Sequence, residues 1–126
     1  MRHSLPARAR RITATALVLL VITAATAIAH VTVVSRTPTP NGVLKRSPTT
    51  ASTTFSGEIK KGTIKVFDAK GKKVSRGNGA KDPRNVRRVS TRLNSGLKNG
   101  RYVVRWNITA GDGHKQSGSY SFRIKK

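Results

Sequence analysis

Two alternating stretches near the end of the chain constrain its fold most strongly. Residues 101–108 carry large apolar side chains at every second position: Tyr102, Val104, Trp106 and Ile108. Residues 118–124 repeat the pattern with Tyr120, Phe122 and Ile124. Because successive side chains of a strand point to opposite faces, each stretch predicts a strand with one buried face. We expect these two rows to supply much of the core.

The remaining sequence reads as short extended stretches between turns. Further strands are expected at residues 30–35, 43–44, 51–55, 62–67, 72–74 and 86–93. Residues 75–85 hold glycines, a proline and small polar side chains, and we expect a mobile loop there. No stretch has a helical period. About seven short strands with regular turns predict an all-β fold, a two-sheet antiparallel sandwich.

The first 29 residues have the composition of a signal peptide. Four arginines and no acid precede an apolar run, and Ala27-Ile28-Ala29 gives the small residues that signal peptidase reads. We therefore expect a signal peptide at residues 1–29, export from the cytoplasm, and a domain at residues 30–126. The alternative is an uncleaved membrane anchor, since the apolar run is close to the roughly 17 residues that a span needs at minimum.

The charge of the expected domain is strongly positive. Four of the 26 lysines and arginines precede residue 30, which leaves 22 against four acids and a formal charge of +18. Such a charge favours anionic partners and says nothing about the fold. An anionic membrane or an acidic cell-wall polymer is a candidate partner, whereas export argues against nucleic acid. For the basic residues of segments 58–73 and 84–92, a solvated face is the expected interpretation, and a dedicated binding patch is the alternative.

Three residues are candidate metal ligands. His30 would become the amino terminus after cleavage and would offer a metal both its amine and its ring nitrogen. Asp112 and His114 lie in the loop between the two alternating strands. A mixed set of nitrogen and oxygen donors favours Cu(II). The chain has no cysteine, and its one methionine is Met1, so thiolate and thioether ligands are absent from residues 30–126. The simpler alternative is that all three are ordinary surface residues.

The last third of the chain resembles the CopC family of exported copper-binding proteins. The resemblance rests on residues 99–106 (NGRYVVRW), Asp112-Gly113-His114 and residues 117–122 (SGSYSF), and extends loosely to His30 and the Asn41-Gly42 turn. It implies an immunoglobulin-like or cupredoxin-like sandwich that binds one Cu(II) per chain through His30, Asp112 and His114. Lys115-Gln116 departs from the family pattern of proline and an apolar residue, Gly57 is inserted, and the positive charge is unusual.

Three functions are compatible with these features. The resemblance implies an extracytoplasmic carrier or sequestering protein for copper homeostasis or resistance, with a membrane copper transporter as partner, and no enzymatic activity. A basic adhesion or wall-binding module without a functional metal site is the second. An oxidative copper enzyme is the third, because an N-terminal histidine also chelates copper in polysaccharide monooxygenases, but few aromatic residues remain for a sugar-binding face. No hydrolytic triad or phosphate-binding loop is present in the sequence.

Overall fold

The computed structural model describes residues 2–4, 14–21 and 30–126. Its strands form two four-stranded sheets, with the orders β1-β3-β6-β5 and β2-β8-β7-β4. The strands are β1 (Val33–Thr37), β2 (Val43–Leu44), β3 (Thr50–Phe55), β4 (Ile59–Phe67), β5 (Ala80–Asp82), β6 (Asn85–Arg92), β7 (Gly100–Ala110) and β8 (Lys115–Ile124). Helices are absent from the described ranges. The predicted sandwich is therefore confirmed.

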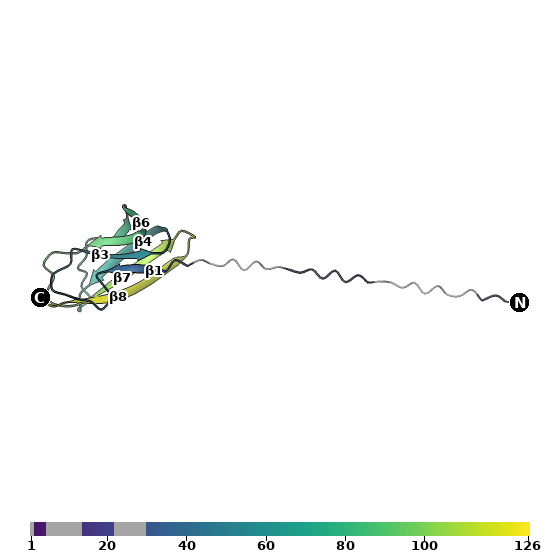
Figure 1. The fold of residues 1–126 in the computed structure, drawn as a ribbon, viewed down its shortest axis with the longest axis horizontal. Coiled ribbons are helices and arrows are strands. Elements are labelled where there is room, and N and C mark those ends of the chain that lie inside the picture. Colours follow the sequence, from purple (N-terminus) through teal and green to yellow (C-terminus); the bar gives the residue numbers. More distant parts are fainter. Residues whose placement is uncertain (1, 5–13, 22–29) are drawn as a thin grey trace.

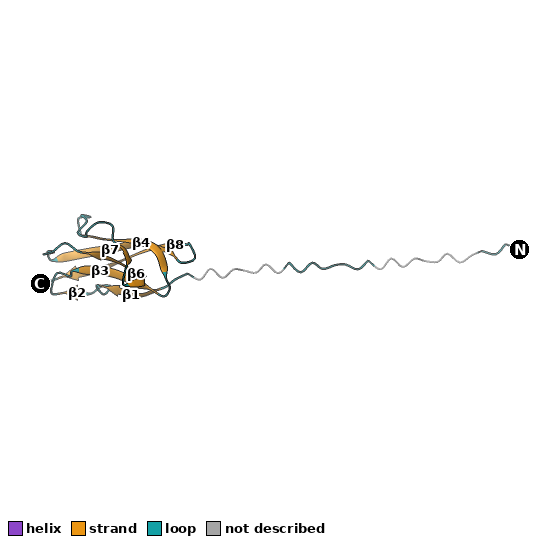
Figure 2. Ribbon diagram, turned by 90° about the horizontal axis from the view of Figure 1, so that it is seen from above, coloured by secondary structure: helices purple, strands orange, loops and turns teal. Residues whose placement is uncertain are grey.

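The two sheets stack face to face. Figure 2 shows the layers edge-on, with β4, β7 and β8 in one and β1, β3 and β6 in the other. The chain enters at the end of the sandwich opposite the C terminus, and the loop between β7 and β8 lies at this entry end (Figure 1). This common placement brings the amino-terminal part of the domain to the loop that carries Asp112 and His114.

The core consists of the two alternating rows and the strands that face them. All seven large residues of those rows are buried, from Phe122 at 0% exposure to Tyr120 at 8%. Trp106 packs edge to face against Phe55 of the opposite sheet at 4.9 Å between ring centroids. A Cβ atom on Gly118, the cross-strand partner of Trp106, would overlap the indole ring, so a glycine is required there. Burial of each such side chain stabilises the fold by roughly 1.5–3 kcal/mol.

Tyr120 also ties the two sheets together. Its hydroxyl lies 2.8 Å from the carbonyl oxygen of Thr37 on β1 and 3.1 Å from that of Ser52 on β3, and its single proton serves these two acceptors. Burial of the neutral hydroxyl raises the pKa of Tyr120 to about 12.

The structure differs from the sequence-based expectations in three places. The sandwich is antiparallel as predicted except at one short pairing, where the two-residue β2 pairs with β8 in parallel. Residues 75–85 are not all loop: they contain β5, which pairs with β6. Residues 72–74 contribute only an isolated bridge, between Phe67 and Lys73. β5 is a short polar strand at a sheet edge with little apolar alternation, so the sequence pattern missed it.

The expected signal-peptidase site, Ala27-Ile28-Ala29, lies outside the described residues. Among the residues that the structure describes, no helix is long and apolar enough to cross a membrane.

Candidate metal centre

The loop that carries Asp112 and His114 is a tight four-residue connection between β7 and β8. The backbone N–H of Ala110 donates to the His114 carbonyl at 2.8 Å, and that of Gly113 donates back to the Ala110 carbonyl at 2.9 Å. Gly113 has φ +90°, a conformation that side chains disfavour, so glycine is needed at this position. The Gly111 N–H donates to the Glu58 carbonyl at 3.0 Å and holds the loop to β4. The loop is thus fixed by backbone hydrogen bonds.

Asp112 and His114 form a local pair within this loop. The Asp112 carboxylate accepts the backbone N–H of His114 at 3.0 Å, and its other oxygen lies 3.0 Å from the Nδ1 atom of the His114 ring. The backbone hydrogen bond from His114 is the largest cause that lowers the pKa of Asp112, and the His114 and His30 rings contribute. Asp112 is therefore a carboxylate at neutral pH, and the Nε2 edge of His114 is left for a ligand.

His30 lies beside this pair although it is 84 positions away from His114 in the sequence. The centroids of the two imidazole rings are 6.0 Å apart, and their planes make an angle of 75°. All three predicted ligands therefore converge at one end of the sandwich. The exposed fractions of the Asp112 and His114 side chains, 34% and 47%, leave them open to an ion from solvent.

Two side-chain contacts hold the segment after His30 in place. Gln116 at the start of β8 donates its amide N–H to the Val31 carbonyl at 2.9 Å. Ser56 accepts the Thr32 N–H on its side-chain oxygen at 2.9 Å, and the Ser56 N–H donates to the Thr32 carbonyl at 2.8 Å. The segment is therefore bound both to the strand that follows the loop and to the end of β3.

The sequence analysis missed the role of Gln116. Gln116 stands two residues ahead of Gly118, in the inward-facing row of β8, and is the cross-strand partner of the buried Ile108. Two features of the sequence could have pointed to Gln116. It is a polar residue that continues a row of buried residues, and it departs from the apolar residue of the family pattern. Its Oε1 atom is buried and has no hydrogen-bond partner among the described residues.

The inserted glycine that departs from the family pattern also has a structural reason. A Cβ atom on Gly57 would lie 2.9 Å from a methyl carbon of Val31. Val31 is partly buried and packs against the core cluster. A larger residue at position 57 would push Val31 outward, and with it the neighbouring His30.

The spacing of the two rings is compatible with one shared metal ion. A metal–nitrogen bond is about 2 Å long, so a bound ion lies about 3 Å from the centroid of the imidazole ring. The centroids of two rings that share one ion are therefore at most about 6 Å apart. The observed 6.0 Å is at this upper limit. In the described part of the chain, no group of three or more His, Cys, Asp or Glu side chains is placed so that it could hold a metal ion without a movement of side chains. A small inward rotation of either ring would shorten the distance.

One positive charge lies close to the candidate centre. A Cβ atom built on Gly113 would lie 4.0 Å from the Lys60 ammonium nitrogen. This charge opposes the binding of a divalent cation, whereas the Asp112 carboxylate favours it. These two groups therefore act in opposite directions on a cation at this end of a protein whose overall charge is strongly positive.

Comparison with protein families and curated proteins gives a consistent result. The family model described as the CopC domain matches residues 33–125. The copper transport protein CutJ of Bacillus subtilis is 30% identical over 112 residues, which cover 87% of this chain and 21% of that protein. This chain therefore spans about a fifth of that relative. Protein YobA of Escherichia coli is 25% identical over 99 residues, 77% of this chain and 80% of that protein.

Solved structures show the same fold. CopC from Methylosinus trichosporium OB3b superposes with a TM-score of 0.64 at 24% identity, over 76% of this chain and 94% of that one. PcoC, a methionine-rich copper resistance protein from Escherichia coli, superposes with a TM-score of 0.61 at 19% identity, over 77% of this chain and 100% of that one. At these identities the likeness concerns the fold.

Proposed function

The chain belongs to the CopC domain family, and on this premise we propose that it is an extracytoplasmic protein that binds one Cu(II) ion and sequesters or carries it. The observation that carries the proposal is the convergence of His30, Asp112 and His114 at one end of the sandwich. Copper is the cargo in this proposal, and the chain performs no catalysis.

The proposed ligands have the chemistry that Cu(II) prefers. Cu(II) favours a tetragonal field of nitrogen and oxygen donors. The His30 and His114 rings supply two nitrogens, and the Asp112 carboxylate supplies an oxygen or, through its contact with Nδ1, fixes the orientation of the His114 ring. If the chain is cleaved after Ala29, the freed amine of His30 adds a third nitrogen and closes a six-membered chelate with the Nδ1 atom of its own ring.

The proposal places the protein outside the cytoplasm and gives it a transport partner. Export is supported by the composition of residues 1–29. A membrane copper transporter as partner is supported by the similarity to part of a relative named as a copper transport protein. The exposure of Asp112 and His114 is compatible with transfer of the ion to another protein.

The free amine of His30 gives the sharpest test. Intact mass of the secreted protein, measured with and without Cu(II) under native conditions, reports the mature terminus and the number of ions bound. One alanine added ahead of His30 should weaken Cu(II) binding about tenfold or more, because the chelating amine becomes a peptide nitrogen. The matched control adds one alanine after Lys126, at the opposite end of the sandwich (Figure 1).

Two results would contradict the proposed site. A mature terminus at a residue other than His30 would remove the chelate. Unchanged Cu(II) affinity in the alanine-extended protein, measured by competition with a chelator of known affinity, would show that the His30 amine is not a ligand. A protein that binds no Cu(II) in either form would leave the wall-binding module as the better function.

A further inference from the structure

The outer face of the β1-β3-β6-β5 sheet is covered by hydroxyl and guanidinium groups. Thr50, Ser52 and Thr54 of β3 pair across the sheet with Arg92, Ser90 and Arg88 of β6. Cross-strand partners share a face, and the residues between them on β3 and β6 point into the core, as the burial of Ala51, Val89 and Thr91 shows. Hydroxyl and guanidinium N–H groups donate hydrogen bonds to anionic oxygens.

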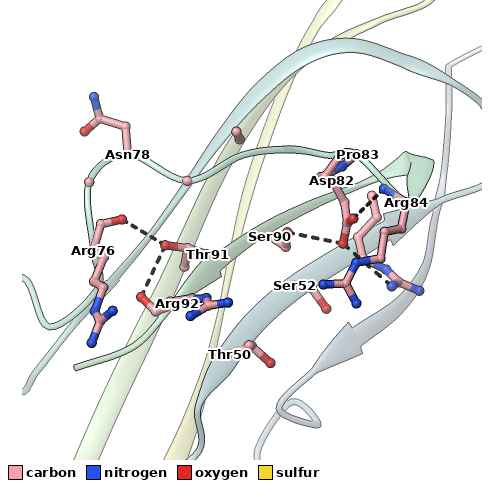
Figure 3. Close-up of a pocket in the computed structure, with 14 residues that line it drawn as sticks. Thr50, Ser52, Arg76, Asn78, Asp82, Pro83, Arg84, Ser90, Thr91 and Arg92 are labelled. Atoms are coloured by element: carbon pink, nitrogen blue, oxygen red, sulfur yellow. Dashed lines mark hydrogen bonds and ion pairs between the residues drawn. The ribbon is translucent and has the colours of Figure 1, made fainter. Parts of the chain in front are cut away.

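This face is hollowed rather than flat. A depression of about 610 Å³ is bounded by β3 and β6 on one side and by residues 76–84 on the other. Its lining includes four arginines: Arg76, Arg84, Arg88 and Arg92. Figure 3 shows Arg76 and Arg92 toward one end and Asp82 with Arg84 toward the other, with Ser52 and Ser90 between them.

A second depression continues the first. It has a volume of about 560 Å³, and Thr50, Arg76 and Arg92 line both. The two together form a groove, which we call the arginine groove, from Arg84 at one end to Gly96 at the other. Arg88 and Arg92 are four residues apart on a strand, about 13 Å. The arginines of the lining are therefore spread along the groove from residue 84 to residue 92, a spacing that suits an extended ligand.

The groove carries more positive charge than its own carboxylate balances. Asp82 accepts the backbone N–H of Arg84 at 2.9 Å and the Ser90 hydroxyl at 3.3 Å, and it lies 3.9 Å from an Arg88 nitrogen. Arg76, Arg84 and Arg92 are exposed, and none of them makes an ion pair with a described residue. The other three acids of the chain, Glu58, Asp68 and Asp112, are absent from its lining.

The wall of the groove is anchored to the sandwich. The Arg76 N–H donates to the Arg92 carbonyl at 2.8 Å, and the Ile64 N–H of β4 donates to the Asn78 carbonyl at 2.9 Å. The Thr91 hydroxyl donates to the Arg76 carbonyl at 3.1 Å. Gly79, with φ +63°, allows this close approach, because a Cβ atom there would lie 2.7 Å from the Ile64 carbonyl oxygen. The arginines are thus held on a fixed frame, which lowers the entropy lost on binding.

We propose that the arginine groove binds an extended polymer that carries repeated phosphate groups. Guanidinium groups bind phosphate oxygens in pairs of parallel hydrogen bonds, and the hydroxyls of Thr50 and Ser52 add further donors along the same line. The groove shares no residue with His30, Asp112 or His114, so this binding site is separate from the proposed copper site.

The lining favours a phosphate polymer without bases over a bilayer or a single-stranded nucleic acid. Neither depression contains an aromatic side chain, and the only large aliphatic residue is Leu93, which is 4% exposed. Single-stranded nucleic acid needs aromatic side chains for base stacking. Peripheral insertion into a bilayer needs exposed apolar groups beside the charges. A phosphate polymer without bases or acyl chains needs neither.

The test measures binding of end-labelled inorganic polyphosphate by fluorescence anisotropy, with copper-free protein. Arg76→Gln with Arg92→Gln removes the two arginines shared by both depressions. Its matched control is Arg101→Gln with Arg123→Gln, because these two exposed arginines are cross-strand partners on the other sheet. The groove variant should lose about tenfold or more in affinity and the control less than about threefold, with a flatter salt dependence for the groove variant.

Several outcomes would overturn the proposal. Equal losses in the two double variants would mean that total charge attracts the polymer and that the groove has no special role. Orthophosphate that competes as well as polyphosphate at equal phosphate concentration would rule out an extended ligand. Tighter binding to phosphatidylglycerol vesicles or to a single-stranded oligonucleotide of equal charge would identify a different partner. A cooperative thermal unfolding transition of both double variants establishes that they fold. If the groove double variant does not fold, the single variants Arg76→Gln and Arg92→Gln replace it in the binding measurement.

Discussion

The candidate metal centre and the arginine groove use the same local device for opposite purposes. In each, an aspartate accepts the backbone N–H of the residue two positions on: His114 for Asp112, at 3.0 Å, and Arg84 for Asp82, at 2.9 Å. What differs is the surroundings. Asp112 lies beside two imidazole rings, whose charge depends on the pH. Asp82 lies among four arginines, which are always charged.

The difference shows that the turn around an aspartate does not decide which ion a site attracts. The carboxylate of Asp112 places negative charge beside two imidazole rings, an arrangement that favours a cation. Four arginines surround the single carboxylate of Asp82, so the net charge of the groove is positive and favours an anion. Asp82 itself contacts Arg84, Arg88 and Ser90 and holds them in position. The two sites should therefore respond independently to mutation, pH and salt.

His114→Ala should separate the two sites most clearly. Loss of a direct ligand should lower Cu(II) affinity by about 100-fold or more, since even outer partners of metal ligands contribute about 10- to 100-fold. Polyphosphate affinity should stay unchanged. Chelator competition measures the first and anisotropy the second. Because His114 lies in an exposed loop, the unfolding midpoint should stay within about 2 °C, and a large drop would instead indicate a structural role.

Acidification should affect the two sites differently. Metal ligands must be deprotonated, so Cu(II) affinity should fall as the pH is lowered from about 7 to about 5. The pKa of Asp112 is lowered, so its carboxylate stays ionised as the pH falls through this range and only stronger acid removes its contribution. Guanidinium groups and internal phosphates also stay charged, so polyphosphate binding should hardly change. Parallel losses of both ligands would contradict two separate sites.

Gln116→Leu should weaken copper binding by about tenfold without removing a ligand. The amide of Gln116 holds the Val31 carbonyl and therefore positions His30. Electron paramagnetic resonance of the Cu(II)-loaded variant should show fewer nitrogen ligands, a change that a merely less stable fold would not cause. Asn107→Leu, in the outward row of β7, is the control and should leave the spectrum unchanged.

Lys60→Gln should have the smallest effect and the opposite direction. Removing the ammonium group beside Gly113 should tighten Cu(II) binding by about two- to threefold at low ionic strength. The gain should disappear at about 1 M salt, where screening is effective within about 3 Å. Lys70→Gln, in the turn after β4, is the matched control. A gain that persists at high salt would indicate a structural change instead.

The fold was predictable because its longest strands alternate strictly. The rows of β7 and β8 face the core as expected, and Val89 and Thr91 of β6 and the following Leu93 are buried, as the predicted row requires. β5 was missed, because Ala80, Lys81 and Asp82 have no apolar alternation and form a strand only by pairing with β6. The arginine groove was missed too, since the sequence shows a run of arginines but not the wall that turns a basic face into a groove.

By itself, the sequence determined the two-sheet class, the three candidate ligands and the large positive charge, because periodicity, residue type and charge are properties of the chain. Only the tertiary structure decided which distant groups meet. The Gln116 hydrogen bond to the Val31 carbonyl, across 85 positions, brings His30 to 6.0 Å from the His114 ring, and the backbone hydrogen bonds of Arg76 and Asn78 place an arginine wall opposite β6. Such long-range contacts depend on how the sheets stack, and no local pattern in a single sequence encodes them.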